Sequence, residues 1–298
     1  MLYLESFSLA SSDSEDSFIL NYPYQLEMQC YTHNVYPFKI FPQKQLRRLE
    51  FEPVTILYGG NGSGKTTLLN VIAEKLKISR SAPFNNTPYF DDYIRRCCFE
   101  FFQRNSVPRN SKLIASDDVF DYLLDMRSIN EGISDRREKL FEEYYDKRNN
   151  HYQLRSLDDY DELKSRNEAK RKTKSEYVTS RLPKEISGGS NGESAFSYFV
   201  HEIKGNALYL LDEPENSLSV KLQTELAEFI ENSARFYNCQ FIISTHSPFL
   251  LSMKNAKVYD LDAVPVTEKK WTELENVRIW FDFFEKHRKT LLGEQNIQ

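Results

Sequence analysis

Apolar and polar positions alternate along the chain in an order typical of an α/β protein. The run 53–58 is β-rich and ends at a glycine, and residues 66–76 contain no Gly or Pro and place apolar side chains at helical intervals. Farther along, 207–211 and 241–244 predict two buried strands, and an amphipathic pattern over 218–237 predicts a helix between them. Parallel strands need such crossover helices, so we expect an α/β fold with a mixed or parallel central sheet flanked by helices.

The rest of the chain is expected to surround this sheet. Residues 1–58 indicate short strands broken by polar turns, and 271–298 indicate a helical tail. A helix is expected near 118–126, and 131–181 carry nearly balanced charges with no Pro, which favours a charged helical insertion. We therefore predict one domain over 1–298 that contains a helical insertion or lid over 81–185.

A glycine-rich loop follows the first of these strands. It reads GGNGSGKT and matches the pattern G-x-x-x-x-G-K-[ST] between a predicted strand and a predicted helix. Glycines let backbone N–H groups converge on phosphate oxygens, and the helix presents its positive N-terminal end to the same anion. Lys65 is expected to neutralise the β- and γ-phosphates, and Thr66 to offer a hydroxyl to Mg²⁺. The predicted nucleotide-binding residues are Gly59, Gly60, Asn61, Gly62, Ser63, Gly64, Lys65, Thr66 and Thr67.

Two carboxylates end the apolar run 207–211. A strand of this kind aims its last residues at the phosphate site, so Asp212 is expected to orient the water shell of Mg²⁺. Glu213 is placed to polarise or deprotonate the water that attacks the γ-phosphate. Taken alone, the pair would also fit an acidic turn after a strand, and it is the glycine loop that favours the catalytic interpretation.

A histidine follows the strand 241–244. His246 comes after the carboxylate strand and its helix, a position from which it is expected to reach the γ-phosphate. The other histidines of the chain have no such context. The predicted catalytic residues are therefore Lys65, Glu213 and His246.

The segments GGNGSGKTT, LYLLDEPE and IISTHSP together resemble the Walker A, Walker B and switch-histidine segments of the ABC-type ATPase superfamily. They look most like its small soluble branch, the AAA family (AAA_21-like) ATPases, over about residues 53–80 and 183–252. The resemblance implies that the chain binds ATP with Mg²⁺ and hydrolyses it to ADP and phosphate. The continuation PENSL after Glu213 is similar to the soluble branch and departs from transporters.

The resemblance also implies a Ser/Gly signature from a second protomer that closes over the γ-phosphate, so that hydrolysis needs a head-to-tail homodimer. Two registers fit the segment 187–194. Ser187-Gly188-Gly189 looks like a transporter-type signature, whereas Ser190-Asn191-Gly192-Glu193 looks like the S-x-G-E form of the soluble branch. We favour the second, with Ser190 and Gly192 as nucleotide-binding residues, over the alternative of a turn that only caps a helix.

Two further family positions stay open. Gln103 is a candidate for the glutamine that binds Mg²⁺, although its spacing does not favour it. The aromatic residue that stacks on adenine is to be sought among Tyr24, Tyr31 and Tyr36.

Composition limits the partners. The chain of 298 residues is 40% hydrophobic and 28% charged, which is typical of a soluble globular protein. No apolar run approaches the length of a membrane span and the N-terminus lacks the features of a signal peptide, so we expect a cytoplasmic protein with no membrane contact. A net charge of -5 argues against an overall electrostatic attraction to nucleic acid.

These sequence features fit three functions. The leading hypothesis is a soluble ATPase whose nucleotide-driven dimer closure regulates a separate effector, such as the nuclease or toxin of a bacterial anti-phage defence module, as the resemblance implies. The alternative is a DNA-repair or recombination ATPase that clamps duplex DNA with the basic run Lys170-Arg171-Lys172-Thr173-Lys174. A transporter nucleotide-binding subunit is the third, and it would co-purify with a membrane protein.

Overall fold

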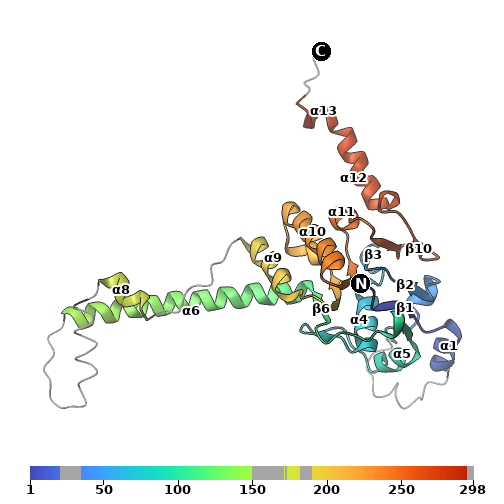
Figure 1. The fold of residues 1–298 in the computed structure, drawn as a ribbon, viewed down its shortest axis with the longest axis horizontal. Coiled ribbons are helices and arrows are strands. Elements are labelled where there is room, and N and C mark those ends of the chain that lie inside the picture. The colour runs from blue at the N-terminus through green and yellow to red at the C-terminus, as the bar shows by residue number, and fades with distance from the viewer. Residues whose placement is uncertain (21–34, 150–170, 172, 182–189, 294–298) are drawn as a thin grey trace. The chain divides into compact units, whose positions relative to one another are not determined.

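The computed structural model describes residues 1–20, 35–149, 171, 173–181 and 190–293 (Figure 1). These residues form two compact units, the first made of Met1–Val119 with Ala195–Gln298 and the second of Phe120–Ser194. The strands are β1 (Leu4–Ser8), β2 (Arg48–Glu50), β3 (Val54–Tyr58), β4 (Ser79–Arg80), β5 (Cys98–Phe101), β6 (Lys112–Ala115), β7 (Ala207–Asp212), β8 (Cys239–Ser244), β9 (Lys257–Asp260) and β10 (Thr267–Glu268).

Helices connect and cover these strands. They are α1 (Ser12–Leu20), α3 (Ile40–Gln43), α4 (Lys65–Leu76), α5 (Phe90–Arg96), α6 (Ser116–Asn149), α8 (Lys174–Thr179), α9 (Asn191–Glu202), α10 (Val220–Phe236), α11 (Pro248–Leu251), α12 (Glu275–Lys286) and α13 (Arg288–Leu291). Short 3-10 helices lie at Phe102–Arg104 (η1), Pro214–Ser217 (η3) and Trp271–Glu273 (η4).

A seven-stranded sheet forms the centre of the first unit. Its strand order is β10-β9-β3-β8-β7-β6-β4, and every neighbouring pair is parallel except β9 with β10. This is the mixed, mostly parallel sheet flanked by helices that the hydrophobic pattern predicts. The strands predicted at 53–58, 207–211 and 241–244 are β3, β7 and β8, and the helix predicted at 218–237 is α10.

The buried strands are apolar on both sides, and helices cover both faces of the sheet. Leu208, Leu210 and Ile242 belong to the core cluster that also holds the buried side of α4. The neighbouring side chains of Tyr209 and Phe241 point to the opposite face of the sheet, where their ring centroids lie 5.6 Å apart. Helix α10 packs on β8.

A second, antiparallel sheet has the order β2-β1-β5. It is joined to the central sheet by Gln240 of β8, whose side chain is fully buried. The Gln240 carboxamide oxygen accepts hydrogen bonds from the backbone N–H groups of Tyr3 and Leu4, each at 2.8 Å, and its Nε2 donates to the Leu4 carbonyl at 2.8 Å. One polar side chain thus satisfies three backbone groups at the junction of the two sheets.

The N-terminal segment contains a helix as well as the expected strands. α1 occupies Ser12–Leu20, and its first turn carries Asp13 and Glu15, which interact favourably with the positive end of a helix. Glu15 is buried and accepts a hydrogen bond from the Lys39 backbone N–H at 2.6 Å. This tertiary contact is not visible in the local pattern of residues 1–58.

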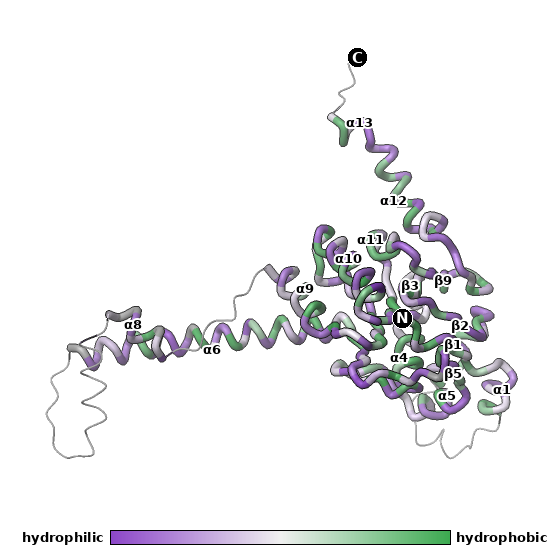
Figure 2. The backbone as a smooth tube through the Cα atoms, viewed as in Figure 1, coloured by the Kyte–Doolittle hydropathy of each residue, from purple (hydrophilic) through white to green (hydrophobic). Residues whose placement is uncertain are grey.

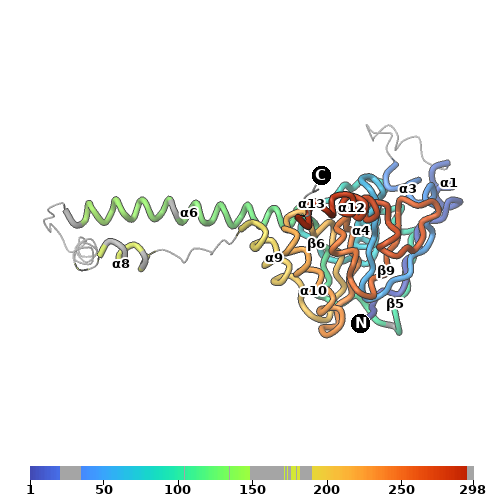
Figure 3. Tube along the Cα trace, turned by 90° about the horizontal axis from the view of Figure 1, so that it is seen from above, coloured from blue at the N-terminus to red at the C-terminus, as the bar shows by residue number. Residues whose placement is uncertain are grey.

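The second unit is helical where it is described. The long helix α6 runs through it, and Figures 2 and 3 show α8 alongside α6. Figure 2 also shows that hydrophilic and hydrophobic residues alternate along α6. Leu140 and Tyr144 of α6 pack against Tyr177 and Val178 of α8. The second compact unit covers Phe120–Ser194, and the lid over 81–185 stays a prediction.

Among the described residues, none of the helices combines the length and the apolar character that crossing a membrane requires. The described cysteines, Cys97, Cys98 and Cys239, are free thiols.

Replacing Gln240 by Leu should weaken the junction between the sheets. Leucine has a similar size but leaves the buried backbone groups of Tyr3 and Leu4 without partners, and each such group costs about 1–3 kcal/mol. We expect the free energy of unfolding to fall by about 3 kcal/mol in urea titrations. Lys221→Leu, at an exposed position of α10, is the control and should change it by less than about 0.5 kcal/mol. A Gln240→Leu protein as stable as the control would contradict the assigned role.

Candidate nucleotide-binding site

The ends of three parallel strands bring the predicted site residues together. In the sheet, Ser244 of β8 is in register with both Leu57 of β3 and Asp212 of β7. The glycine loop, Glu213 and His246 follow directly on these three positions. Because the carboxyl ends of parallel strands meet at one edge, segments separated by more than 180 residues in the chain lie side by side.

The glycine loop runs from β3 into α4 and has the shape of an anion cradle. Gly62 and Gly64 have φ angles of 80° and 95°, which residues other than glycine rarely adopt. A Cβ on Gly59 would lie 2.7 Å from Ser63 Oγ. That hydroxyl is buried and has no hydrogen-bond partner. A buried donor without a partner, beside the first turn of a helix, fits a site that takes a phosphate group.

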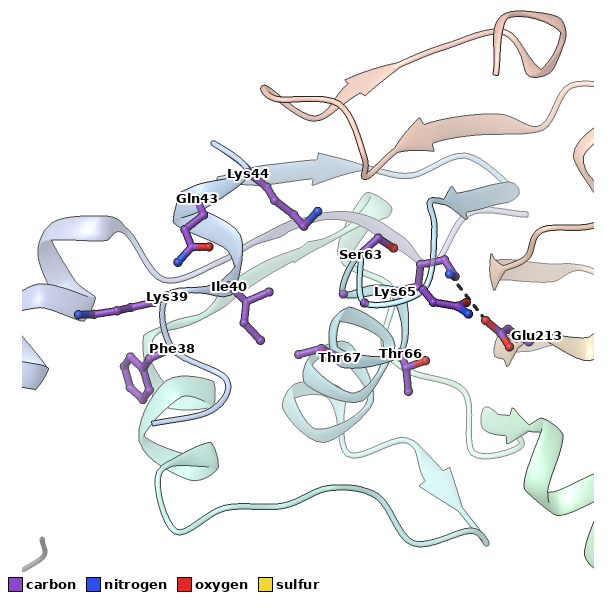
Figure 4. A pocket seen from close by; sticks show the side chains of 13 residues that line it. Phe38, Lys39, Ile40, Gln43, Lys44, Ser63, Lys65, Thr66, Thr67 and Glu213 are labelled. Carbon is purple, nitrogen blue, oxygen red and sulfur yellow. Dashed lines mark ion pairs between the residues drawn. The ribbon is translucent and has the colours of Figure 1, made fainter. Parts of the chain in front are cut away.

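Lys65, Glu213 and His246 form one cluster at the edge of this loop, and Figure 4 shows the ion pair between Lys65 and Glu213. The Lys65 side chain is only 4% exposed, and its ammonium group donates to the carbonyls of Gly59 at 2.7 Å and Gly60 at 3.2 Å. Lys65 Nζ lies 2.7 Å from His246 Nε2 and 3.6 Å from Glu213 Oε1. His246 Nε2 lies 3.4 Å from the same carboxylate. The three predicted catalytic residues therefore meet.

The Glu213 carboxylate is held in its charged form. A hydrogen bond with His246, another from Asn216, and the charge of Lys65 lower its pKa to about 2. Its backbone has a φ of 48°, an uncommon conformation for a residue other than glycine. The Glu213 N–H donates to the Ser244 carbonyl at 3.0 Å, which stabilises this turn and directs the side chain toward the loop. A carboxylate that is ionised near neutral pH can accept a proton from water.

Asp212 lies one residue earlier and is more deeply buried. Burial raises its pKa, while hydrogen bonds from Ser244 and Thr66 act in the opposite direction. Ser244 Oγ donates to Asp212 Oδ1 at 2.5 Å. Thr66 and Asp212, the two predicted metal ligands, are thus in contact. This hard-oxygen pair beside a phosphate cradle fits Mg²⁺, which takes few protein ligands and completes its shell with phosphate and water.

Glu215 is a residue whose role the sequence motifs did not reveal. Its Oε1 accepts hydrogen bonds from the backbone N–H groups of His246 at 2.7 Å and Ser247 at 3.2 Å. The side chain is mostly buried, and this burial raises its pKa. Glu215 therefore fixes the backbone that carries His246, and only the tertiary contact between η3 and the end of β8 indicates this.

A cavity of about 590 Å³ opens beside the glycine loop. Its walls include Ile40, Gln43 and Lys44 on one side and Lys65 and Glu213 on the other (Figure 4). A mixed apolar and polar wall of this kind suits a nucleoside, whereas the lysine side suits its phosphates. Ile40, Gln43 and Lys44 belong to no sequence motif, so no local pattern predicts that they line this cavity.

The candidates for the adenine-stacking aromatic residue and for the Mg²⁺-binding glutamine are Tyr24, Tyr31, Tyr36 and Gln103. The Tyr36 hydroxyl donates to Thr67 Oγ1 at 3.1 Å, and Tyr36 does not line the cavity, while Tyr24 and Tyr31 lie outside the described residues. Gln103 is exposed in η1, after a strand of the antiparallel sheet rather than the parallel one. In the central sheet, β7 lies between β8 and β6, and the β6 residue in register with Asp212 is Ala115.

The segment predicted as the signature begins α9. The Ser190 N–H donates to Glu193 Oε2 at 2.7 Å, and the Glu193 N–H donates to Ser190 Oγ at 3.4 Å. This reciprocal pair is a capping box, the arrangement expected when Ser and Glu are three residues apart at a helix start. Ser187, Gly188 and Gly189 lie outside the described residues, so the competing register has no structural counterpart here.

A parallel sheet, a glycine loop that leads into a helix, and two carboxylates at the adjoining strand end define a P-loop nucleoside triphosphatase. The family model described as "ABC transporter" matches residues 48–216, more than half of the chain. A second model, described as "AAA domain, putative AbiEii toxin, Type IV TA system", matches residues 190–252. The chain belongs to the ABC-type ATPases and is an ATP hydrolase of that class.

Comparison with solved structures finds likenesses at low identity. An inward-facing metal-chelate type ABC transporter is 17% identical over 95% of this chain and 90% of its own, with a TM-score of 0.41. An Smc head domain from Pyrococcus furiosus, with an extended coiled coil and bound to the C-terminal domain of ScpA, is 15% identical over 81% of this chain and 95% of its own, with a TM-score of 0.37. No curated protein sequence matches the chain.

The substitution Glu213→Gln tests the proton acceptor. The amide keeps the size and a hydrogen-bond acceptor but cannot take a proton from water, and such transfer typically contributes 10²–10⁴-fold. We expect the ATP turnover rate to fall by at least about 100-fold while the Kd for ATP, measured by calorimetry, changes by less than about threefold. Unchanged turnover would exclude Glu213 as the base.

The substitutions Glu215→Gln and Glu215→Leu test whether hydrogen bonds from Glu215 to the backbone around His246 are needed for ATP turnover. Glutamine keeps an oxygen that accepts from the N–H groups of His246 and Ser247, whereas leucine removes the acceptor of the His246 N–H and leaves the Ser247 N–H with Thr245 Oγ1 at 3.0 Å as its acceptor. We expect turnover to be largely retained in Glu215→Gln and to fall by about tenfold or more in Glu215→Leu, since each lost bond costs about 1–3 kcal/mol. Equal activity in the two variants would show that these hydrogen bonds do not position His246 for turnover.

Proposed function

We propose that this chain is a nucleotide-driven switch: two copies close head-to-tail around Mg-ATP, and this closure regulates a separate effector protein. The observation that carries the proposal is the start of α9, where an exposed serine, a glycine and a helix N-terminus are presented together. Such a helix start binds anions through its free N–H groups. The segment lies inside the region matched by the AAA domain model.

Within one copy, each site residue has a distinct task. The loop amides and Lys65 bind the β- and γ-phosphates of ATP, and Lys65 exchanges its contacts with the Gly59 and Gly60 carbonyls for phosphate oxygens. Glu213 accepts the proton of the attacking water, and His246, fixed by Glu215, lies beside the γ-phosphate. Thr66 and Asp212 would hold Mg²⁺, which would supply positive charge beside the transferred phosphoryl group.

The second copy supplies what this arrangement lacks. In the proposal, Ser190 and Gly192 of one copy approach the γ-phosphate bound to the other, so the nucleotide joins the two surfaces. The Ser190 hydroxyl is engaged as an acceptor in the capping box, but its own hydrogen stays available for a phosphate oxygen. ATP therefore acts as part of the interface, and hydrolysis weakens it.

The effector is proposed to be a nuclease or toxin that acts with this ATPase. The support is the description of the AAA domain model, which names a toxin and a toxin–antitoxin system. Purification of the chain together with the products of its neighbouring genes, with ATP and with ADP, tests this part. Failure to retain any of these products in either nucleotide state would exclude a stable effector complex. Of the basic run 170–174 behind the DNA-clamp alternative, residues 170 and 172 lie outside the described residues.

The dimer can be tested at Ser190 without loss of the helix cap. Asp and Asn cap helices as well as Ser does. Ser190→Asp adds a negative charge opposite the γ-phosphate, whereas Ser190→Asn is the neutral control. In the Glu213→Gln background with Mg-ATP, we expect a dimer by light scattering for the parent and for Ser190→Asn, and a monomer for Ser190→Asp, with ATP binding retained.

A dimer that forms equally well in Ser190→Asp would contradict the favoured register. The same measurement on Ser187→Asp then tests the other register. If neither substitution affects the nucleotide-dependent dimer, closure over the γ-phosphate by the segment 187–194 is excluded.

A further inference from the structure

Helix α12 and the short helix α13 that follows it carry an apolar surface that none of the other described residues covers. The start of α12 is anchored, because Leu274 and Val277 are buried and the Asn276 N–H donates to the Tyr58 hydroxyl at 3.2 Å. Beyond this anchor, large apolar side chains are about half exposed or more. They are Ile279 (56%), Trp280 (48%), Phe281 (57%), Phe283 (58%), Phe284 (50%), Leu291 (66%) and Leu292 (63%), here called the α12 apolar surface.

The pattern is that of a helix that packs against another helix. Trp280 and Phe284, four residues apart, share one side of α12, and Phe281 and Phe283 flank them. Arg278, Asp282 and Glu285 follow one another at spacings of four and three on the opposite side. Figure 2 shows the resulting alternation of hydrophobic and hydrophilic residues along α12.

The exposed area is large enough for a stable interface. An aromatic side chain buries about 150–250 Å², so the half-exposed rings and aliphatic chains together offer on the order of 500 Å² per copy. Two such surfaces that cover each other remove on the order of 1,000 Å² from water, the lower range of specific interfaces. A hollow of about 330 Å³, lined in part by Phe281, Phe284, Leu291 and Leu292, gives the surface a shape that a bulky side chain can enter.

The order of charges along the segment points to an antiparallel partner. Glu273 and Glu275 lie at its start, whereas Lys286, Arg288 and Lys289 lie at its end. Two copies placed antiparallel bring the acidic start of one next to the basic end of the other, while a parallel arrangement places like charges together. A two-fold axis near Asp282 also sets Trp280 of each copy against Phe284 of the other. The surface is thus complementary to itself.

We propose that the α12 apolar surface is an antiparallel homodimer interface that forms without nucleotide. This contact is additional to the ATP-dependent closure proposed above and lies on different residues. A membrane surface is disfavoured as the occupant, because acidic and basic side chains are interleaved on the polar side of the helix, whereas helices that bind anionic membranes carry mainly Lys and Arg there.

The experiment measures the oligomeric state of the nucleotide-free full chain by analytical ultracentrifugation over a range of micromolar concentrations. We expect the parent to be a dimer and Trp280→Glu/Phe284→Glu to raise its dissociation constant by at least about 100-fold, since central aromatic side chains carry much of the energy of an interface. Asp282→Asn, on the polar side, is the matched control and should leave the dimer intact. Retained ATP binding shows that each variant is folded.

A charge exchange tests the antiparallel arrangement itself. Glu273→Lys/Glu275→Lys makes both ends basic, and Lys286→Glu/Lys289→Glu makes both ends acidic. Each variant alone should dimerise more weakly than the parent, and this comparison reports the orientation, because a parallel parent would already place like charges together. A mixture of the two should form a heterodimer through its opposite charges. Because Lys65 and Ser190 are unchanged and no nucleotide is present, these results are independent of the proposed ATP-dependent closure.

Three results would overturn the proposal. A parent chain that stays monomeric without nucleotide excludes the interface, and binding of that monomer to vesicles containing anionic phospholipid would assign the surface to a membrane. A dimer that survives Trp280→Glu/Phe284→Glu places the contact elsewhere. A mixture of the two charge variants that stays monomeric excludes the antiparallel arrangement.

Discussion

The register of the parallel strands β3, β8 and β7 is the constraint on which the site depends. Leu57, Ser244 and Asp212 are aligned across the sheet, so the segments that follow them emerge at one edge. A shift of one residue in either pairing would turn every side chain of a strand to the other face of the sheet and separate Glu213 from Lys65. The apolar side chains buried on both faces oppose such a shift, because it would move them out of their packing.

Charge is balanced locally at this edge. The buried ammonium group of Lys65 lies near the Glu213 carboxylate and two loop carbonyls, which offset the cost of burying a charge. The same contacts lie where the phosphates of a nucleotide would bind, so phosphate binding replaces one set of interactions with another. The hydrogen bond with His246 and the charge of Lys65 keep the Glu213 pKa low, so the carboxylate stays ionised near neutral pH.

Positioning groups that have no predicted catalytic or binding role hold this arrangement. Glu215 binds two backbone N–H groups around His246, Ser244 binds Asp212, and the Gly60 N–H donates to Asp262 at 2.6 Å. Gln240 joins the antiparallel sheet to β8 through three hydrogen bonds. Glu215 and Ser244 lie inside the quoted segments LYLLDEPE and IISTHSP, but no local spacing reveals the contacts of any of the four side chains, because each acts on a partner that is distant in the chain.

The amino-acid sequence by itself determined the local elements of the site. The glycine loop, the apolar strands around it and the amphipathic helix α10 follow from short-range patterns, because backbone freedom and hydrophobic periodicity are local properties. Only the tertiary structure decided that Lys65, Glu213 and His246 meet, that Ile40 and Gln43 form a wall of the cavity, and that the aromatic side chains of α12 remain exposed. These outcomes depend on strand order and on contacts between distant segments, which no local pattern encodes.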